Sequence, residues 1–359
     1  MKKYLNQQDM KDINIGSVLR LIRRAGPMTR RQIEAAADMS WGAISNATAL
    51  LLREGYIKEV KIPAPAGAGR TPIALEVDRE THCLLGLDVN RSDLSGVVTD
   101  LTGEVLHRVE LEPTATKREE WIDEISALIR RLLSLATDRR VLAVGVAMQG
   151  AVDSKHGIAA SFPAESWQDV PLAQILSERF SLPVYLEHDP DCILYAASAQ
   201  RDLRDAILLR ADKGIGMAVM LNGRIFKRFG AFEIGEMPVN GRRLADVATL
   251  TGAAQNAGMP FAELKKAAER GEKAALSHFE EIGRALGVAM DGVAQLFNIR
   301  EFLLCGKLTA HRDLFANAMQ GALTAFPTHE PLRVDYTEVG LAAVGAALLA
   351  VERHELHFE

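Results

Sequence analysis

The stretch from Gly26 to Val60 constrains this chain most, because it reads as two short helices followed by a strand. Thr29 stands where a hydroxyl group can cap the first helix, and Ser40 stands where one can cap the second after a short break. Glu54-Gly55 is a typical end for the second helix, since glycine readily adopts the backbone conformation that stops a helix. The pattern predicts a helix-turn-helix.

The second predicted helix has two different faces. The apolar face carries Ile44, Ala47, Thr48 and Leu51, and the opposite face carries Gly42, Ser45, Asn46 and Ala49. A recognition helix needs such an outer face, because small and polar side chains can reach base edges. We expect Asn46 to pair with an adenine and Ser45 to contact a base or a phosphate. A helical hairpin whose outer face is only solvated would show the same pattern.

A hairpin is predicted after the second helix. Tyr56–Ile62 and Ile73–Val77 alternate enough to pair as strands, and PAPAGAGRTP between them is typical of the tip of a wing, although a plain linker has a similar composition. Arg70 in this tip could enter a minor groove. The residues predicted to bind DNA are Thr29, Arg30, Arg31, Ser40, Trp41, Ser45, Asn46, Lys61 and Arg70.

The distribution of charge agrees with a DNA-binding head. The chain has 359 residues and a net charge of -5, yet residues 1–75 hold 12 Lys and Arg against 6 Asp and Glu. A basic head on an acidic body favours contact between the head and phosphate. The three cysteines have no close partners in sequence, and the N-terminus lacks the apolar core of a signal peptide. The run Leu341–Val351 is too short to span a membrane. We therefore expect a soluble cytoplasmic protein.

The rest of the chain predicts a duplicated α/β unit. Two sets of three short strands begin near His82 and at AILLRAD, and alternating helices and strands follow each set. We expect a head over 1–78 and a domain over 79–359, with lobes at about 79–190 and 191–359 and a ligand cleft between them. Helices are expected at Asn14–Ala25, at 309–326 and from about Val339 to Arg353.

Five stretches in the same order carry a resemblance to a known family. They are GLDVNRSDLSGVVTDLTGEVL, ESWQDVPL, PVYLEHDPD, GIGMAVMLNGRI and FEIGEM. The chain resembles the ROK family, which joins sugar kinases to xylose-repressor-type transcription factors on an actin-like, ribonuclease-H-like fold. The resemblance covers almost the whole chain, and it includes the winged head that only the regulators carry. It implies a two-lobed ROK domain behind a winged helix-turn-helix.

The nucleotide-binding loops depart from the kinase pattern that the resemblance implies. The first loop of the kinases reads Asp-x-Gly-Gly-Thr, whereas Asp88–Ser92 here contains no glycine. Glycines let the backbone approach phosphates, and side chains obstruct that approach. Asp212-Lys213 replaces a Gly-Thr pair in the second loop, and Leu304–Lys307 keeps a single glycine of a third. We therefore expect no ATP binding, no enzymatic activity and no cofactor.

The resemblance also implies an effector site. Glu187-His188-Asp189 matches a Glu-Asn-Asp motif whose Asp is the catalytic base of the kinases. Here Asp189 would accept a hydrogen bond from a sugar hydroxyl, cap the following helix, or do both. His188 stands where the family has a sugar-binding Asn, and it can equally be a structural histidine. Trp167 is expected either to close one side of the site or to pack within its lobe.

A second motif completes the predicted site. Glu233 matches a sugar-binding Glu, and Glu236 replaces a His that binds both sugar and a structural zinc in the family. Pro238–Ala254 contains no cysteine, so we predict no metal site. The predicted effector-binding residues are Trp167, Glu187, His188, Asp189, Glu233 and Glu236.

These features favour a DNA-binding transcriptional regulator, most simply a repressor of sugar uptake or catabolism genes that binds double-stranded operator DNA and a sugar-like effector. By resemblance it would be a homodimer or homotetramer. The alternatives are a ROK-type sugar kinase with a fused head and a regulator that responds to a protein partner.

Overall fold

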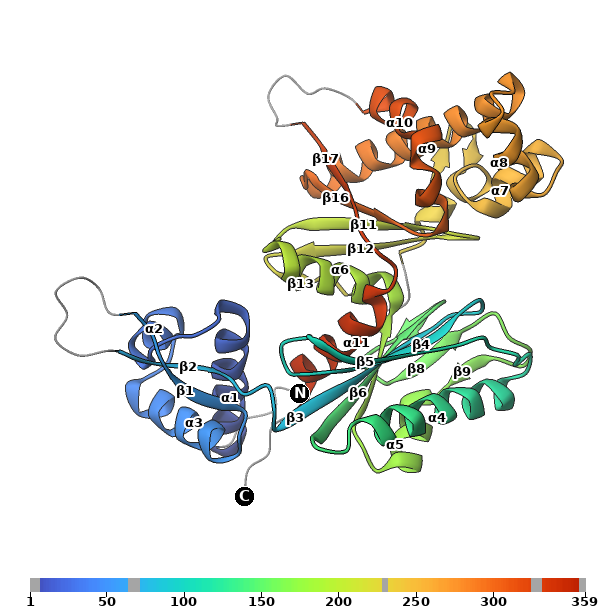
Figure 1. Cartoon of the computed structure of the whole chain (residues 1–359). Helices are drawn as coiled ribbons and strands as arrows, with labels where there is room; N and C mark the ends of the chain where they lie inside the picture. Colours follow the sequence, from blue (N-terminus) through green and yellow to red (C-terminus); the bar gives the residue numbers. More distant parts are fainter. Residues whose placement is uncertain (1–6, 64–71, 228–231, 324–330, 355–359) are drawn as a thin grey trace. The chain divides into compact units, whose positions relative to one another are not determined.

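The computed structural model describes residues 7–63, 72–227, 232–323 and 331–354. The chain forms two compact units. The first unit comprises Met1–Gln149, Asp153–Glu187 and the chain from Ala343 onward, and the second comprises Gly150–Val152 and His188–Ala342. Figure 1 labels the helices and strands. The second lobe was expected to extend to the end of the chain, but in the structure the residues from Ala343 onward belong to the first unit.

The head consists of three helices and a two-stranded sheet. Its elements are α1 Gln7–Ala25, α2 Arg30–Ala36, α3 Trp41–Arg53, β1 Ile57–Lys61 and β2 Ile73–Val77. The Thr29 side chain accepts a hydrogen bond from the Gln32 backbone, and the Gln32 side chain accepts one from the Thr29 backbone, which forms a capping box. Ser40 caps α3 through the Ala43 amide. The helix-turn-helix and its hairpin are therefore confirmed (Figure 1).

The first unit contains a five-stranded sheet with the order β10-β6-β3-β4-β5. Its strands are β3 His82–Val89, β4 Leu94–Thr99, β5 Val105–Leu111, β6 Arg140–Met148 and β10 Val184–His188, and its helices are α4 Arg118–Leu135, α5 Leu172–Phe180 and α11 Leu341–Arg353. A small sheet is made of β7 Val152–Asp153, β8 Ile158–Ser161 and β9 Gln168–Val170. Every residue of β3 is buried, as expected for a strand covered on both faces.

The second unit repeats this plan. Its main sheet has the order β13-β12-β11-β16-β17, in which β11 pairs antiparallel with β12 and parallel with β16, as β3 does with β4 and β6. The strands are β11 Ala206–Ala211, β12 Ile215–Leu221, β13 Arg224–Ile225, β16 Glu301–Cys305 and β17 Arg333–Tyr336, with the short pair β14 Pro238–Val239 and β15 Arg242–Arg243. The equivalent strand order confirms the predicted duplication.

Helices complete the second unit. They are α6 Asp189–Arg201, α7 Leu250–Ala257, α8 Phe261–Glu269, α9 Lys273–Phe297 and α10 Ala316–Ala322, with 3-10 helices η1 Ile234–Glu236, η2 Leu244–Asp246 and η3 Lys307–Leu314. Gly216 of β12 lies against the start of α6, because a Cβ added there would be 3.0 Å from Cγ of Pro190.

Three predicted helix boundaries differ from the structure. The first helix begins at Gln7 rather than Asn14, and the last begins at Leu341 rather than Val339. The single helix expected over 309–326 is wrong within the described residues, since η3 is interrupted by a non-helical His311 and α10 ends at Ala322. Polar starts and mixed 3-10 and α geometry leave little periodicity in sequence, so the boundaries were poorly determined.

Two glycines allow α11 to lie directly on the first sheet. A Cβ added at Gly86 would be 1.9 Å from the carbonyl oxygen of Ala343, and one added at Gly145 would be 2.0 Å from that of Ala346. Backbone therefore packs on backbone, without an intervening layer of side chains. This contact fixes the position of α11 on β3 and β6.

We expect Gly145→Ala to lower the free energy of unfolding of the first unit by about 1–3 kcal/mol or more, since the added methyl group would overpack this contact. Denaturant titration of the full chain, followed by a probe in the first unit, measures the change. Gly321→Ala is the matched control, because no heavy atom beyond its neighbours lies within 4 Å of a Cβ built there. Equal unfolding midpoints for both variants would contradict this interpretation.

Candidate nucleic-acid interface and effector site

The exposed face of α3 is the one predicted from sequence. Ile44, Ala47, Thr48 and Leu51 are buried, whereas Trp41, Gly42, Ser45, Asn46 and Ala49 are exposed. Trp41 is 49% exposed, which is unusual for a large aromatic side chain at the start of a helix. The exposed polar and aromatic groups of α3 form a surface that can meet the edges of bases.

Arg30 and Arg31 have different surroundings. Nε of Arg30 donates to Oγ1 of Thr48 at 3.3 Å, and its guanidinium pairs with Glu59 at 3.3 Å, so Arg30 links α2, α3 and β1. Arg31 and Lys61 are exposed. Arg31 and Lys61 are thus better placed than Arg30 for phosphate contacts. Arg70 lies outside the described residues, so its predicted role stays a prediction.

The hydroxyl groups of Thr29 and Ser40 are already used within the head. Each caps a helix, at 3.3 Å from the Gln32 amide for Thr29 and 3.3 Å from the Ala43 amide for Ser40. Capping satisfies backbone donors at the helix start and fixes where the helix begins. These two residues therefore position the candidate interface.

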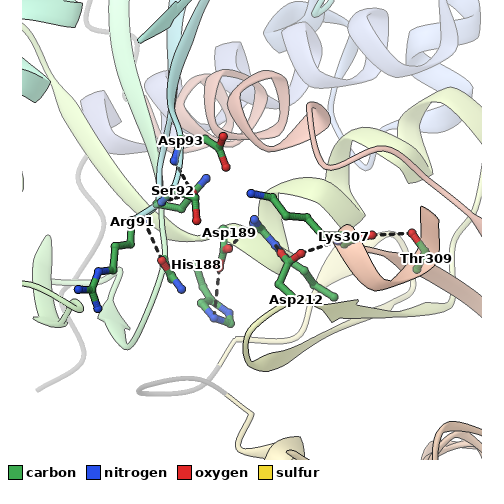
Figure 2. Close-up of polar contacts among 12 residues, drawn as sticks. Arg91, Ser92, Asp93, His188, Asp189, Asp212, Lys307 and Thr309 are labelled. Atoms are coloured by element: carbon green, nitrogen blue, oxygen red, sulfur yellow. Dashed lines mark hydrogen bonds and ion pairs between the residues drawn. The ribbon is translucent and has the colours of Figure 1, made fainter. Parts of the chain in front are cut away.

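A cluster of charged residues surrounds the start of α6 in the second unit (Figure 2). The carboxylate of Asp189 is paired with the guanidinium of Arg210 on β11, and Nε2 of His188 lies 3.5 Å from Oδ1 of Asp189. The side chains of Asp189 and Arg210 are 6% and 13% exposed. Asp189 was predicted to accept a hydrogen bond from a sugar, and the structure gives it a guanidinium partner that the sequence did not reveal.

The chain of pairs continues through Asp212. Nε of Arg210 donates to Oδ2 of Asp212 at 2.8 Å, and Oδ1 of Asp212 accepts a hydrogen bond from the backbone of Lys307 at the start of η3. The backbone oxygen of Asp212 also accepts from the amide of Leu250. Asp212 is therefore held by β11, η3 and α7, and its carboxylate occupies the backbone donor at the start of η3 (Figure 2).

The turn between β3 and β4 is closed by its own side chains. Oδ1 of Asn90 accepts hydrogen bonds from the amides of Ser92 and Asp93, and the Arg91 amide donates to the Gln149 side chain. Asn90 is buried. An Asx turn of this kind uses a side chain where the kinase pattern has glycines.

Glu187 is placed differently from the predicted effector ligands that follow it. It is fully buried, and its two carboxylate oxygens bind Oγ of Ser154 at 2.9 Å and the guanidinium of Arg353 at 3.0 Å. A buried carboxylate needs such partners. Glu187 therefore holds the end of α11, and its predicted contact with an effector stays a prediction.

Trp167 packs within its own unit. It is 7% exposed, its Nε1 donates to the carbonyl of Ala159 at 3.2 Å, and its ring lies 5.1 Å from that of Phe162. Phe162 in turn contacts Trp121. Of the two predicted roles, the structure favours lobe packing.

Glu233 and Glu236 are exposed at η1. Glu236 pairs with Arg243 at 3.3 Å, and Arg243 also binds Asp246, where its hydrogen bond lowers the pKa of that carboxyl group. A Cβ added at Gly235 would be 3.2 Å from Ile215 of β12. Since Gly216 lies against Pro190 at the start of α6, neighbouring residues of β12 contact both α6 and η1.

Within the described residues, no group of three or more His, Cys, Asp or Glu side chains has the arrangement of a metal site. In the same part of the chain, no helix has both the length and the apolar composition that crossing a membrane requires.

Comparison with known sequences gives consistent matches. The model of the ROK family matches residues 84–353. The chain is 27% identical over 361 residues to the DNA-binding transcriptional dual regulator NagC of Escherichia coli K12, covering 90% of this chain and 88% of that protein. It is 25% identical over 246 residues to the xylose repressor of Caldicellulosiruptor bescii, covering 66% and 61%.

Solved structures support the same fold. A ROK family transcriptional regulator, described as a homolog of the E. coli MLC protein, has a TM-score of 0.83 at 20% identity, covering 96% of this chain and 97% of that chain. A ROK family glucokinase from Streptomyces griseus, in complex with glucose and AMPPNP, has a TM-score of 0.63 at 20% identity, covering 75% and 99%. These matches confirm the predicted fold class, and the regulator covers more of this chain than the glucokinase does.

Proposed function

The chain belongs to the ROK family, and on that premise we propose that it is a DNA-binding transcriptional repressor of sugar uptake or catabolism genes, controlled by a sugar-like effector. The observation that carries the proposal is the winged helix-turn-helix head whose recognition helix exposes Ser45 and Asn46. The match to a transcriptional regulator over 90% of the chain supports it. The protein would act in the cytoplasm as a homodimer or homotetramer on a palindromic operator.

The second part of the proposal is that the chain does not phosphorylate sugars. Asp189, at the position of the kinase base, is held in an ion pair by Arg210, an arrangement that suits binding rather than proton transfer. The carboxylate of Asp212 occupies the backbone donor at the start of η3, where it would also repel a phosphate. Asn90 fills the turn after β3. No cofactor is needed for the proposed function.

The effector would contact His188, Asp189, Glu233 and Glu236. A carboxylate has about four acceptor sites, so Asp189 can accept from a sugar hydroxyl while it keeps Arg210. Relatives are named for N-acetylglucosamine and for xylose, which makes these two sugars the first to test. The two carboxylates of Asp189 and Asp212 carry more negative charge than the single guanidinium of Arg210 balances. A neutral or amino sugar is therefore favoured over a sugar phosphate.

Operator binding tests the head. DNA fragments retained by the purified protein from fragmented genomic DNA supply the operator, and fluorescence anisotropy gives the affinity. We expect Asn46→Ala to weaken binding by about 1–3 kcal/mol and to relax specificity at one base pair. Arg31→Ala should weaken binding to all sequences alike and reduce the salt slope by about 1.

Arg284→Ala serves as the matched control for the arginine variant, because Arg284 is an exposed residue of α9 in the second unit. The assignment of the interface would be wrong if both head variants bound the operator with wild-type affinity and salt dependence.

A kinase assay and elemental analysis test the remaining claims about chemistry. With ATP, Mg²⁺ and either glucose or N-acetylglucosamine, the wild type should form no sugar phosphate. Elemental analysis should find no stoichiometric zinc, since Pro238–Ala254 has no cysteine ligands. ATP-dependent phosphorylation that Asp189→Asn abolishes would refute the first claim, and one bound zinc per chain would refute the second.

A thermal-shift panel tests the effector site. N-acetylglucosamine, xylose, glucosamine and glucose 6-phosphate are compared, and we expect a neutral or amino sugar to raise the melting temperature most. Glu233→Gln should reduce that shift because it removes a charged acceptor. Glu281→Gln is the matched control, since Glu281 is a partly exposed glutamate of the same unit paired with Arg242.

An equal shift in both variants would contradict the assignment of Glu233. If no sugar stabilises the wild type, control by a protein partner becomes the better hypothesis.

A further inference from the structure

The last helix of the chain connects the two units in sequence. Leu341 and Ala342, its first two residues, belong to the second unit, and from Ala343 the helix belongs to the first. Gly86 and Gly145 leave no room for side chains beneath it, so α11 lies on the backbone of β3 and β6. These contacts fix the first half of α11 on the sheet, and the end of the helix, which carries Glu352 and Arg353, lies beyond them.

At its far end, α11 reaches the first helix of the head. Glu352 pairs with Arg23 and lies 3.5 Å from Arg24 and 3.8 Å from Arg20, all on α1. The side chains of Arg23 and Glu352 are 6% and 14% exposed. Breaking a pair this buried leaves an uncompensated charge, so the pair fixes α1 on the end of α11. Apolar residues of α1 and α11 share one core around it.

The next residue, Arg353, binds the end of β10. Its guanidinium donates to Oε1 of Glu187 at 3.0 Å and to the backbone oxygen of Ser154 at 2.7 Å, and it lies over the ring of Tyr185. Glu187 has no exposed surface. It is also the last residue of β10 before the chain passes into the second unit at His188.

Two adjacent residues therefore hold two separate structures. Glu352 holds α1 of the head, and Arg353 holds the end of β10 next to His188 and Asp189. Successive side chains on a helix point about 100° apart, which lets neighbours bind partners on different sides. A change at the end of β10 must move or break the Glu187–Arg353 pair, and it then acts on the residue that holds the head.

We propose that Glu352 and Arg353 are positioning residues that couple the β10–α6 junction to the DNA-binding head through the end of α11. The signal that passes to the head is the occupancy of the effector site at His188 and Asp189. In this respect the inference rests on the proposed function. The coupling itself is a property of contacts within the first unit. It requires that the end of α11 has two arrangements. The state of the β10–α6 junction and the state of the head must each change the equilibrium between these two arrangements.

Hydrogen exchange on the full chain, without DNA or sugar, tests the coupling. Glu187 binds Ser154 and Arg353, which lie outside the head, yet Glu187→Gln should speed amide exchange in α1 on the order of tenfold relative to β3 and β6. In a Glu352→Gln background the same substitution should have little further effect on α1, because the connection is already cut.

Arg179→Gln is the matched control. Arg179 pairs with Asp123 at 2.9 Å and with Ser126 at 2.7 Å in the first unit, away from α11. Its loss should leave the exchange of α1 relative to β3 and β6 unchanged. Should Glu187→Gln fail to fold, Arg353→Lys replaces it, because lysine keeps the positive charge but lacks the planar guanidinium group. The exchange of α1 is again compared with that of β3 and β6. Unchanged exchange in α1, or equal effects of the variant in both backgrounds, would overturn the coupling.

Operator affinity forms a second, separate arm. With N-acetylglucosamine and xylose as probes, Glu352→Gln should reduce the effect of sugar on operator affinity severalfold. If the wild type retains no genomic DNA, the proposed function fails, while the exchange experiment still decides whether the coupling exists. If a sugar changes operator affinity equally in the wild type and in Glu352→Gln, the coupling does not carry the signal.

Discussion

The packing of α11 against two glycines of the first sheet is the contact on which the rest of this structure depends. Gly86 and Gly145 bring helix backbone within contact distance of strand backbone. That position determines where Glu352 and Arg353 lie, and through them where α1 and the end of β10 are held. The head is thus tied to the body by charges on a helix that cannot shift sideways without a clash.

The second unit, whose fold is shared with sugar kinases, holds its central charges through pairs within one cluster. The backbone donors at the start of a helix have no partner within the helix and need an acceptor from elsewhere. Asp212 supplies that acceptor to the backbone of Lys307, and Arg210 balances both Asp212 and Asp189. The charges of Arg210, Asp189 and Asp212 are therefore paired within one cluster.

The sequence predicted the features that depend on periodicity and capping, which are the helices, their faces and the strands. It did not predict the ion pairs between residues that are far apart in the chain. The two faces of α3 followed from spacing alone, and the duplicated sheet from the order of strands. Arg210 was missed because an arginine in the apolar run AILLRAD gives no sign of its partner. The pairing of Glu187 with Arg353 was missed as well, because Arg353 lies 166 residues away in sequence. Ion pairs over such separations have no local signal.

The same chemistry serves opposite purposes in the two units. In the second, Arg210 and the carboxylates of Asp189 and Asp212 pair with one another around the start of α6. In the first unit, buried pairs of the same kind connect elements that are far apart in sequence: Glu352 pairs with Arg23 of α1, and Arg353 pairs with Glu187 of β10. A buried ion pair stabilises a protein little more than apolar packing does. Removing one of its partners strongly lowers the free energy of unfolding, because the other charge stays buried and unpaired. Such pairs therefore act best as position-sensitive connections, and the end of α11, where Glu352 and Arg353 are neighbours, is where two of them meet.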